Sequence, residues 1–334
     1  MRRRDFSLGL LLAGAVPPAP PQEPTKQQHR IAIVIASGPV ARLNDPTSHA
    51  WQAFWQELRR LGDIEGKNLT VERYSGEGRP EGYADLAREI VSRNPDVIVP
   101  ISPPIMQAVS ATTGTIPIVG SGAYTELGQV PSLARPAGNI TGITVTAGYE
   151  IYGKYLQILK EAVPSAIKVA FLDMDTGADR QHRREALEKA SRVLEISLIG
   201  VLLQQSTPSD YHRAFGEIAQ ARPDAIIVSG GSEVYAYRQL ITELVEKIRL
   251  PAMYPAPARD WVEAGGLMAY GTDYAELWRR LADDVHQVLN GAKPADIPIY
   301  QPTKYEFLIN LQAAKAIGFN IPPALLARAD EVIE

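Results

Sequence analysis

The chain has 334 residues, a formal charge of −4 and no cysteine, so disulfides, thiolate metal sites and a cysteine nucleophile are excluded. A mildly acidic protein is not expected to bind nucleic acid, which requires clustered lysine and arginine. The length is typical of two domains, and a composition of 45% hydrophobic residues is sufficient for a large core.

The first residues predict export. Arg2–Arg4 precede a short apolar run that ends at Ala13–Ala15, which is the pattern of a cleaved export signal over residues 1–15. The run is too short to cross a membrane. Arginines followed by Phe6 resemble a twin-arginine signal, and the ordinary secretory route is the alternative. Because a lipid anchor would need a cysteine, we expect a protein that is free in the periplasm of a Gram-negative cell.

A proline-rich tether is expected over residues 16–29, because its prolines cannot lie inside a helix. From Arg30 onward, short buried strands alternate with amphipathic helices. The β-branched run Ile31–Ile35 is typical of a parallel strand that is covered on both faces. In this first half the sequence predicts strands at 31–35, 69–74, 97–99, 116–119 and 140–145, and helices at 46–61, 81–93 and 104–112.

The second half repeats this scheme. Such a repeat predicts an α/β fold of two doubly wound parallel-sheet, Rossmann-like lobes joined by a hinge. The predicted strands are 168–172, 197–202 and 225–228, the helices are 149–162, 179–194, 209–221 and 233–247, and the tail segments 266–268, 274–290, 305–310 and 322–327 return across the lobes. We expect an N-terminal lobe of 30–145 plus about 266–295, and a C-terminal lobe of 146–265 plus about 296–334.

Serine and glycine recur where the predicted strands end. Ligands of open α/β sheets bind beyond the carboxyl ends of the strands. Hydroxyls and free backbone N–H groups at a helix start can hold an anion such as a carboxylate without a formal positive charge. The same residue types also serve as helix caps and turn formers. The candidate ligand-binding residues are Ser37, Ser102, Ser121 and Gly122 in the first half, with Ser229 and Gly230 in the second.

Asp173 and Asp175 follow the first strand of the second half. A calcium loop is rejected because the sixth and twelfth places hold Ala178 and Arg184 instead of glycine and glutamate. Either aspartate could pair with an amine of the ligand or cap a helix.

Aromatic residues near strand ends could hold the apolar part of a ligand. For this role the sequence suggests Tyr124, Tyr254 and Tyr270, with Tyr235 also near a strand end. The tryptophans Trp51, Trp55, Trp261 and Trp278 are interpreted as core residues.

The sequence contains no catalytic signature. Gly120-Ser121-Gly122 lacks the G-x-S-x-G spacing, no G-x-G-x-x-G or phosphate-binding loop is present, and the five histidines form no H-E-x-x-H pair. We therefore predict no enzyme activity, no catalytic residues, no cofactor and no metal.

Several stretches resemble the ABC-transporter substrate-binding protein family related to tryptophan/tyrosine-binding proteins, with the type I periplasmic-binding fold. The stretches are 53–62 with 65–69, 135–142, 263–271, and the longest, 302–311 leading to 325–333. The resemblance implies two lobes with three hinge crossings that close on a small molecule. It also implies an inner-membrane permease with its ATPase as partners. Some relatives take aromatic amino acids, but Asp173–Gly177 replaces the Asn-Pro-Asn-like turn of such relatives.

The function expected from the sequence is a monomeric periplasmic receptor that delivers a small carboxylate-bearing solute, an aromatic or another amino acid, to an ABC importer. Two alternatives stay open. One is a ligand-sensing subunit of a membrane signalling protein, and the other is a hydrolase on the same scaffold with Ser121 as its nucleophile.

Overall fold

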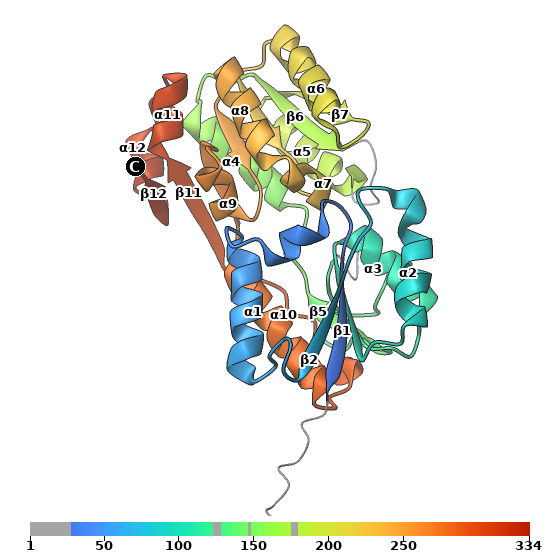
Figure 1. The fold of residues 1–334 in the computed structure, drawn as a ribbon. Coiled ribbons are helices and arrows are strands. Elements are labelled where there is room, and N and C mark those ends of the chain that lie inside the picture. The colour runs from blue at the N-terminus through green and yellow to red at the C-terminus, as the bar shows by residue number, and fades with distance from the viewer. Residues whose placement is uncertain (1–27, 123–127, 146–147, 175–179) are drawn as a thin grey trace, which may run out of the picture.

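The computed structural model describes residues 28–122, 128–145, 148–174 and 180–334. The predicted export signal, nearly all of the tether and the candidates Tyr124 and Asp175 lie outside these residues. The described chain forms two α/β lobes, which Figure 1 shows one above the other.

The first lobe contains a parallel five-stranded sheet in the order β2-β1-β3-β4-β5. Its strands are β1 (His29–Ile35), β2 (Leu69–Ser75), β3 (Val97–Ile101), β4 (Ile118–Ser121) and β5 (Ile140–Ile143). Its helices are α1 (His49–Leu61), α2 (Tyr83–Ser92) and α3 (Pro103–Thr112), with 3-10 turns η1 (Val40–Asn44) and η2 (Pro80–Gly82). From the tail, α10 (Tyr274–Leu289) and η3 (Pro294–Asp296) complete this lobe.

The side chains of β1 show why this sheet is covered on both faces. Successive side chains of a strand point to opposite faces. Ile31 and Ile33 pack in one core with α1 and α10, whereas Ala32 and Val34 pack in another with α2 and α3. The apolar side chains of β1 therefore contribute alternately to the cores on the two faces of the sheet, as expected for a parallel strand covered by helices on each side.

The second lobe contains a seven-stranded sheet in the order β12-β11-β10-β9-β8-β6-β7. All neighbours are parallel except β10 and β11, which are antiparallel. Its strands are β6 (Lys168–Met174), β7 (Ser197–Leu203), β8 (Ala225–Val228), β9 (Ala252–Tyr254), β10 (Met268–Thr272), β11 (Tyr305–Asn310) and β12 (Glu331–Ile333). Its helices are α4 (Ile151–Ala162), α5 (Arg180–Val193), α6 (Pro208–Ala221), α7 (Ser232–Ala236), α8 (Arg238–Ile248), α9 (Ala258–Glu263), α11 (Leu311–Ile317) and α12 (Pro323–Leu326).

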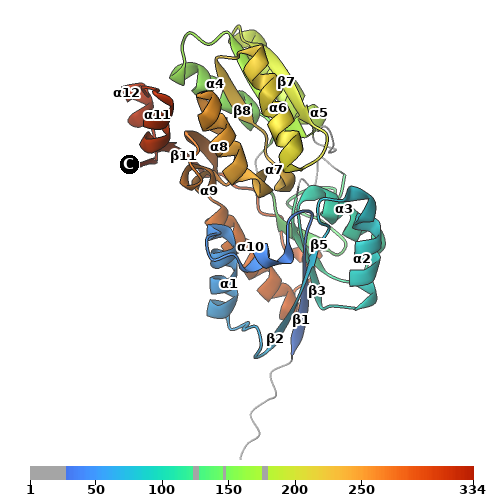
Figure 2. The same cartoon turned by 45° about the horizontal axis from the view of Figure 1, so that its top comes forward.

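The tail joins the lobes. After β10 the chain leaves the second sheet, and the following helix α10 packs against α1 of the first lobe. Figures 1 and 2 show these two helices side by side. The chain then returns past Tyr300, whose backbone accepts a hydrogen bond from the Thr144 N–H at 2.8 Å. The Thr272 hydroxyl donates to the Val145 carbonyl at 2.9 Å. The connecting segments are thus bonded to one another at the waist of the molecule, where a hinge is expected.

Three expectations about the tail and the helices need correction. Residues 268–272 were expected in the N-terminal lobe, but β10 pairs with β9 and β11 of the second sheet, so the return to the first lobe begins only at Asp273. The first lobe also extends to Tyr300, because Ile297 and Ile299 lie in its cores. The helix expected over 233–247 is interrupted at Tyr237, which separates α7 from α8.

Candidate functional site

A cavity of about 240 Å³ lies between the lobes, beyond the carboxyl ends of β1, β3 and β4. It is smaller than the pockets of about 300–1,000 Å³ that take drug-sized ligands, so a molecule of amino-acid size suits it. From the first lobe, polar and charged residues line it: Ser37, Arg42, Asp45, Ser48, Ser102 and Ser121. On the other side the lining is mostly aromatic and proline: Tyr149, Tyr152, Tyr155, Tyr235, Pro255 and Pro257.

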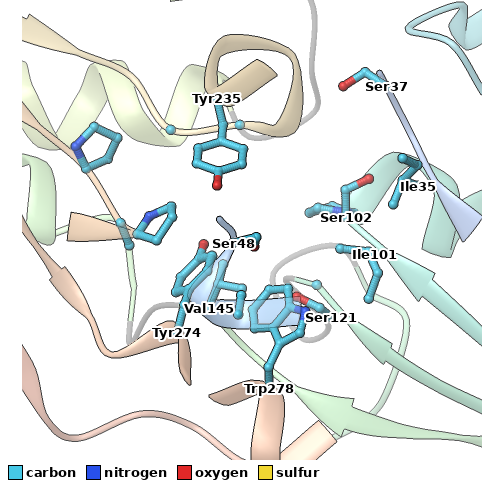
Figure 3. A pocket seen from close by; sticks show the side chains of 18 of the residues that line it. Ile35, Ser37, Ser48, Ile101, Ser102, Ser121, Val145, Tyr235, Tyr274 and Trp278 are labelled. Atoms are coloured by element: carbon cyan, nitrogen blue, oxygen red, sulfur yellow. The ribbon is translucent and has the colours of Figure 1, made fainter. Parts of the chain in front are cut away.

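Three predicted serines meet at this cavity because their strands are neighbours in the sheet. Ser37 follows β1, Ser102 follows β3, and Ser121 ends β4 (Figure 3). Ser102 has a φ of 114°, and its N–H donates to the Ser121 carbonyl at 3.0 Å, which holds this unusual backbone in place. The hydroxyl oxygens of Ser37 and Ser102 are buried and have no hydrogen-bond partner among the described residues. A ligand acceptor would remove the free-energy cost of leaving them unpaired.

The backbone N–H groups expected to hold an anion are mostly not available. Gly122 and Gly230 line the cavity, but the Gly122 N–H donates to a carbonyl of β5 at 3.2 Å. The Gly230 N–H donates to the Tyr152 hydroxyl at 2.9 Å. Helix α3 begins with Pro103 and Pro104, which have no N–H. The expectation of free backbone donors is therefore wrong at these positions.

Arg42 is one of several cavity residues that the sequence did not suggest, and it is the one that contributes a positive charge. It lies in η1, lines the cavity and forms no ion pair with another described residue. Burial, with a smaller contribution from Arg238, lowers the pKa of its guanidinium. The group nevertheless stays protonated, because arginine does not lose its proton in proteins. The cavity therefore contains a cation that can pair with an anionic ligand. The only sequence signal was a basic residue in the loop after the first strand.

Asp45 supplies the opposite charge from the same segment. Its Oδ1 accepts hydrogen bonds from the N–H and hydroxyl of Thr47, at 2.8 and 2.7 Å. Burial acts to raise the pKa of Asp45, but the Thr47 bonds and the charges of Arg238 and Arg42 outweigh it and lower the pKa. Asp45 is therefore ionised at neutral pH and can accept from a ligand ammonium group.

The floor of the cavity is aromatic. Trp51 of α1 and the α10 residues Tyr274 and Trp278 line it. The Tyr274 and Trp278 rings are stacked 4.7 Å apart, and Trp51 meets Trp278 edge-on at 6.2 Å. Figure 3 shows Trp278 rising from α10 and Tyr235 reaching in from the opposite side. Trp51 and Trp278 were interpreted as core residues only; they are buried, but they also form the wall of the cavity.

Asp173 and Ser229 are not among the residues that line the cavity. Asp173 is almost fully buried and forms an ion pair with Arg183 of α5, with Oδ1 and Nη2 2.9 Å apart. Burial raises the pKa of Asp173, while the adjacent Arg183 acts to lower it. Its carboxylate is thus committed to Arg183 and does not serve a ligand amine. Ser229 is fully buried beside it at the end of β8.

Two of the predicted tyrosines also lie elsewhere. Tyr254 is 1% exposed and stacks on Trp261 at 4.8 Å, inside the core of the second lobe. Tyr270 stacks on Tyr305 at 5.5 Å on the antiparallel pair β10 and β11. Tyr254 ends β9 as expected, but Tyr270 is the central residue of β10, and both rings lie in packing contacts.

Metal binding finds no support in the described ranges, which hold no group of three or more histidine, cysteine, aspartate or glutamate residues placed to hold a metal ion. Within the same residues, every helix is too short or too polar to cross a membrane.

The comparisons with known proteins agree with this architecture. Residues 44–333 match the family described as ABC transporter substrate binding protein. A tyrosine-binding protein of Clostridioides difficile (strain R20291) is 24% identical over 270 residues, which cover 80% of this chain and 76% of the relative. The fold of the present chain matches that of a conserved domain protein from Vibrio cholerae with a TM-score of 0.81, at 26% identity over 92% of this chain and 100% of the other.

A second solved structure, an ABC domain from Streptococcus pneumonia in complex with L-Trp, has a TM-score of 0.77 at 19% identity and covers 91% of this chain and 100% of that one. At this identity the likeness shows the fold, which is the type I periplasmic-binding arrangement of two parallel-sheet lobes. The family match spans most of the chain: it includes the whole second sheet, the tail that joins the lobes and every strand of the first sheet except β1. The chain therefore belongs to the ABC transporter substrate-binding protein family.

Proposed function

We propose that this protein is the solute receptor of an ABC importer and that its ligand is a small carboxylate. An aromatic amino acid is the candidate that we favour. The observation that carries the proposal is Arg42, a cation that lines a largely aromatic cavity and forms no ion pair with a described residue. A hydrogen-bonded pair between arginine and carboxylate is strong and geometrically specific. Relatives described as a tyrosine-binding protein and as a complex with L-Trp support an aromatic ligand.

The two lobes contribute different chemistry. The cation, the ionised Asp45 and the unpartnered hydroxyls of Ser37 and Ser102 belong to the first lobe, whereas tyrosines and prolines of the second lobe face them. We infer that the ligand binds to the first lobe through its charged groups and that the second lobe then closes over its apolar part. A ligand that contacts both lobes stabilises the closed state by its higher affinity for that state.

The same proposal gives the partners and the location. The family supports a membrane permease with its ATPase as the acceptor of the bound solute. We infer a periplasmic location from the export signal expected over residues 1–15, because such a permease collects its solute there. Loss of uptake of the labelled ligand in cells that lack this protein, with restoration by the intact gene, is the expected result of a transport assay.

The ligand class is tested by calorimetry and thermal unfolding with matched pairs. L-Tyrosine and L-tryptophan are compared with tyramine and tryptamine, which keep the ring and the amine but lack the carboxylate. The amino acids should bind and raise the melting temperature, because a ligand at 100 times its Kd stabilises the native state by about 2.7 kcal/mol. Equal binding of the amines would show that the carboxylate and Arg42 do not determine recognition.

A further inference from the structure

The indole N–H of Trp278 is a hydrogen-bond donor that the binding scheme above leaves unused. Trp278 is 4% exposed and lines the cavity, and its Nε1 has no acceptor among the described residues. A buried tryptophan N–H usually has a partner, and leaving it without one costs free energy. The indole nitrogen can only donate, so the group that completes this site must be an acceptor.

The position of Trp278 separates this donor from the charged groups. Arg42 contacts the ring of Tyr235, and Figure 3 shows Tyr235 and Trp278 on opposite sides of the cavity. The ring of Tyr274 is stacked on Trp278, so the surroundings of the indole are aromatic rather than charged. A carboxylate favours the cation at the other side. The acceptor that suits Trp278 is therefore a neutral oxygen, at the end of a ligand opposite its carboxylate.

We propose that Trp278 determines specificity by donating a hydrogen bond to a neutral oxygen at the end of the ligand opposite its carboxylate. The inference rests on the proposed function and narrows its ligand class to ring-containing carboxylates with a distal hydroxyl or carbonyl. L-Tyrosine has such an oxygen, L-phenylalanine lacks it, and the distal nitrogen of L-tryptophan is itself a donor. A site built to bind a substrate hydroxyl discriminates against the analogue that lacks it, because its own polar group is then left unpaired.

The test compares ligand pairs that differ only in the distal oxygen. The pairs are L-tyrosine with L-phenylalanine, and 4-hydroxyphenylacetate with phenylacetate. Each is titrated by calorimetry into the wild-type protein, Trp278→Phe and Trp261→Phe. Trp261 is the matched control, because it is equally buried and its Nε1 also lacks an acceptor among the described residues, but it does not line the cavity.

The wild type should bind the hydroxylated member of a pair at least ~10-fold more tightly, and Trp278→Phe should reduce this ratio to about one. Trp261→Phe should leave the ratio unchanged. The ratio compares the affinities of one variant for the two ligands of a pair. A general loss of packing at Trp278 weakens the binding of both ligands and therefore leaves this ratio unchanged. If Trp278→Phe does not fold, the indole N–H signals of the ¹⁵N-labelled wild type provide the readout, and the Trp278 signal should move with tyrosine more than with phenylalanine.

Two negative outcomes can be told apart. If the ligands bind but the distal oxygen makes no difference in the wild type, or if Trp278→Phe preserves the preference, the role of Trp278 is wrong and the carboxylate receptor stands. If no member of either pair binds, the proposed ligand class is wrong, and the inference about Trp278 is overturned with it.

Discussion

The guanidinium carbon of Arg42 lies 5.1 Å from the centre of the Tyr235 ring and so joins the two lobes across the cavity. Arg238 approaches the same ring at 4.7 Å, and the Tyr235 hydroxyl donates to Asp260. One tyrosine of the second lobe is therefore held by a cation from each lobe. Cation–π contacts of this kind contribute about 0.5–2 kcal/mol, depending on how far they are removed from water.

Replacing Arg42 by methionine should abolish tight binding of the carboxylate ligand, because a hydrogen bond to a charged group contributes about 1.5–3 kcal/mol. We expect affinity to fall roughly 10- to 100-fold in calorimetric titrations. Arg238→Met is the matched control, since Arg238 stacks on the same ring but does not line the cavity. Equal losses in both variants would mean that the Tyr235 contact matters and the carboxylate pair does not.

A second contact between the lobes predicts a small effect on closure. His49 of α1 lies 3.1 Å from the Glu263 carboxylate of α9, and both side chains are about 40% exposed (41% and 43%). Exposed pairs contribute at most about 1 kcal/mol, so Glu263→Gln should weaken ligand binding only about two- to fivefold. Glu217→Gln, which breaks an exposed pair with Arg213 inside the second lobe, should leave the affinity unchanged. A loss of 50-fold or more would contradict this ranking.

The buried pair of Asp173 and Arg183 predicts a large effect on stability. Removing one partner of a buried ion pair typically costs about 3–5 kcal/mol. Asp173→Asn should therefore lower the free energy of unfolding by about 3 kcal/mol or more in urea denaturation. Glu188→Gln on the same helix breaks only exposed pairs, with Arg184 and Arg192, and should cost less than about 1 kcal/mol. If Asp173→Asn keeps its stability but loses ligand, Asp173 belongs to the binding site after all.

Asp284 predicts a pH dependence of stability. It is fully buried in α10, its oxygens have no hydrogen-bond partner among the described residues, and Arg280 is 3.8 Å away. Burial raises the pKa of Asp284 from 3.8 to about 7. Because the folded-state pKa is the higher one, the contribution to stability is complete below about pH 4 and is lost as the pH rises to 7.

A shift of about three pKa units corresponds to about 4 kcal/mol at most. Asp284→Asn should flatten the fall in the free energy of unfolding between pH 4 and 8, measured by urea denaturation across that range. Asp85→Asn, which removes an exposed carboxylate of α2, should retain the wild-type slope. An unchanged slope in Asp284→Asn would show that this carboxylate is ionised throughout the range.

Much of the fold could be predicted because its signals are local. The run Ile31–Ile35 lies in β1, and the helices expected over 46–61 and 274–290 are present as α1 and α10. The short elements β9 and α9 were missed, since three to six residues carry too little periodicity. The boundary at β10 was missed for a different reason: pairing of β10 with β11 depends on strands that are distant in sequence.

The candidate site divides in the same way. Ser37, Ser102 and Ser121 could be predicted, because residues after adjacent parallel strands share one edge of a sheet whatever their side chains do. Asp173 and Tyr254 also lie at the carboxyl ends of strands, but Asp173 forms an ion pair with Arg183 and Tyr254 stacks on Trp261. These partners depend on tertiary packing, so the sequence did not indicate them.

The sequence by itself determined the two α/β lobes, the edge of each sheet that carries a site and the serines at that edge. All of these follow from the periodicity of side chains along a strand or helix. Only the tertiary structure shows that Arg42 lines the cavity and that Trp278 forms part of its wall. It also shows that the N–H groups of Gly122 and Gly230 donate hydrogen bonds to acceptors within the protein. The physical reason is that charge pairing, hydrogen-bond partners and exposure depend on which distant segments meet, and nothing in the local pattern of a chain specifies those neighbours.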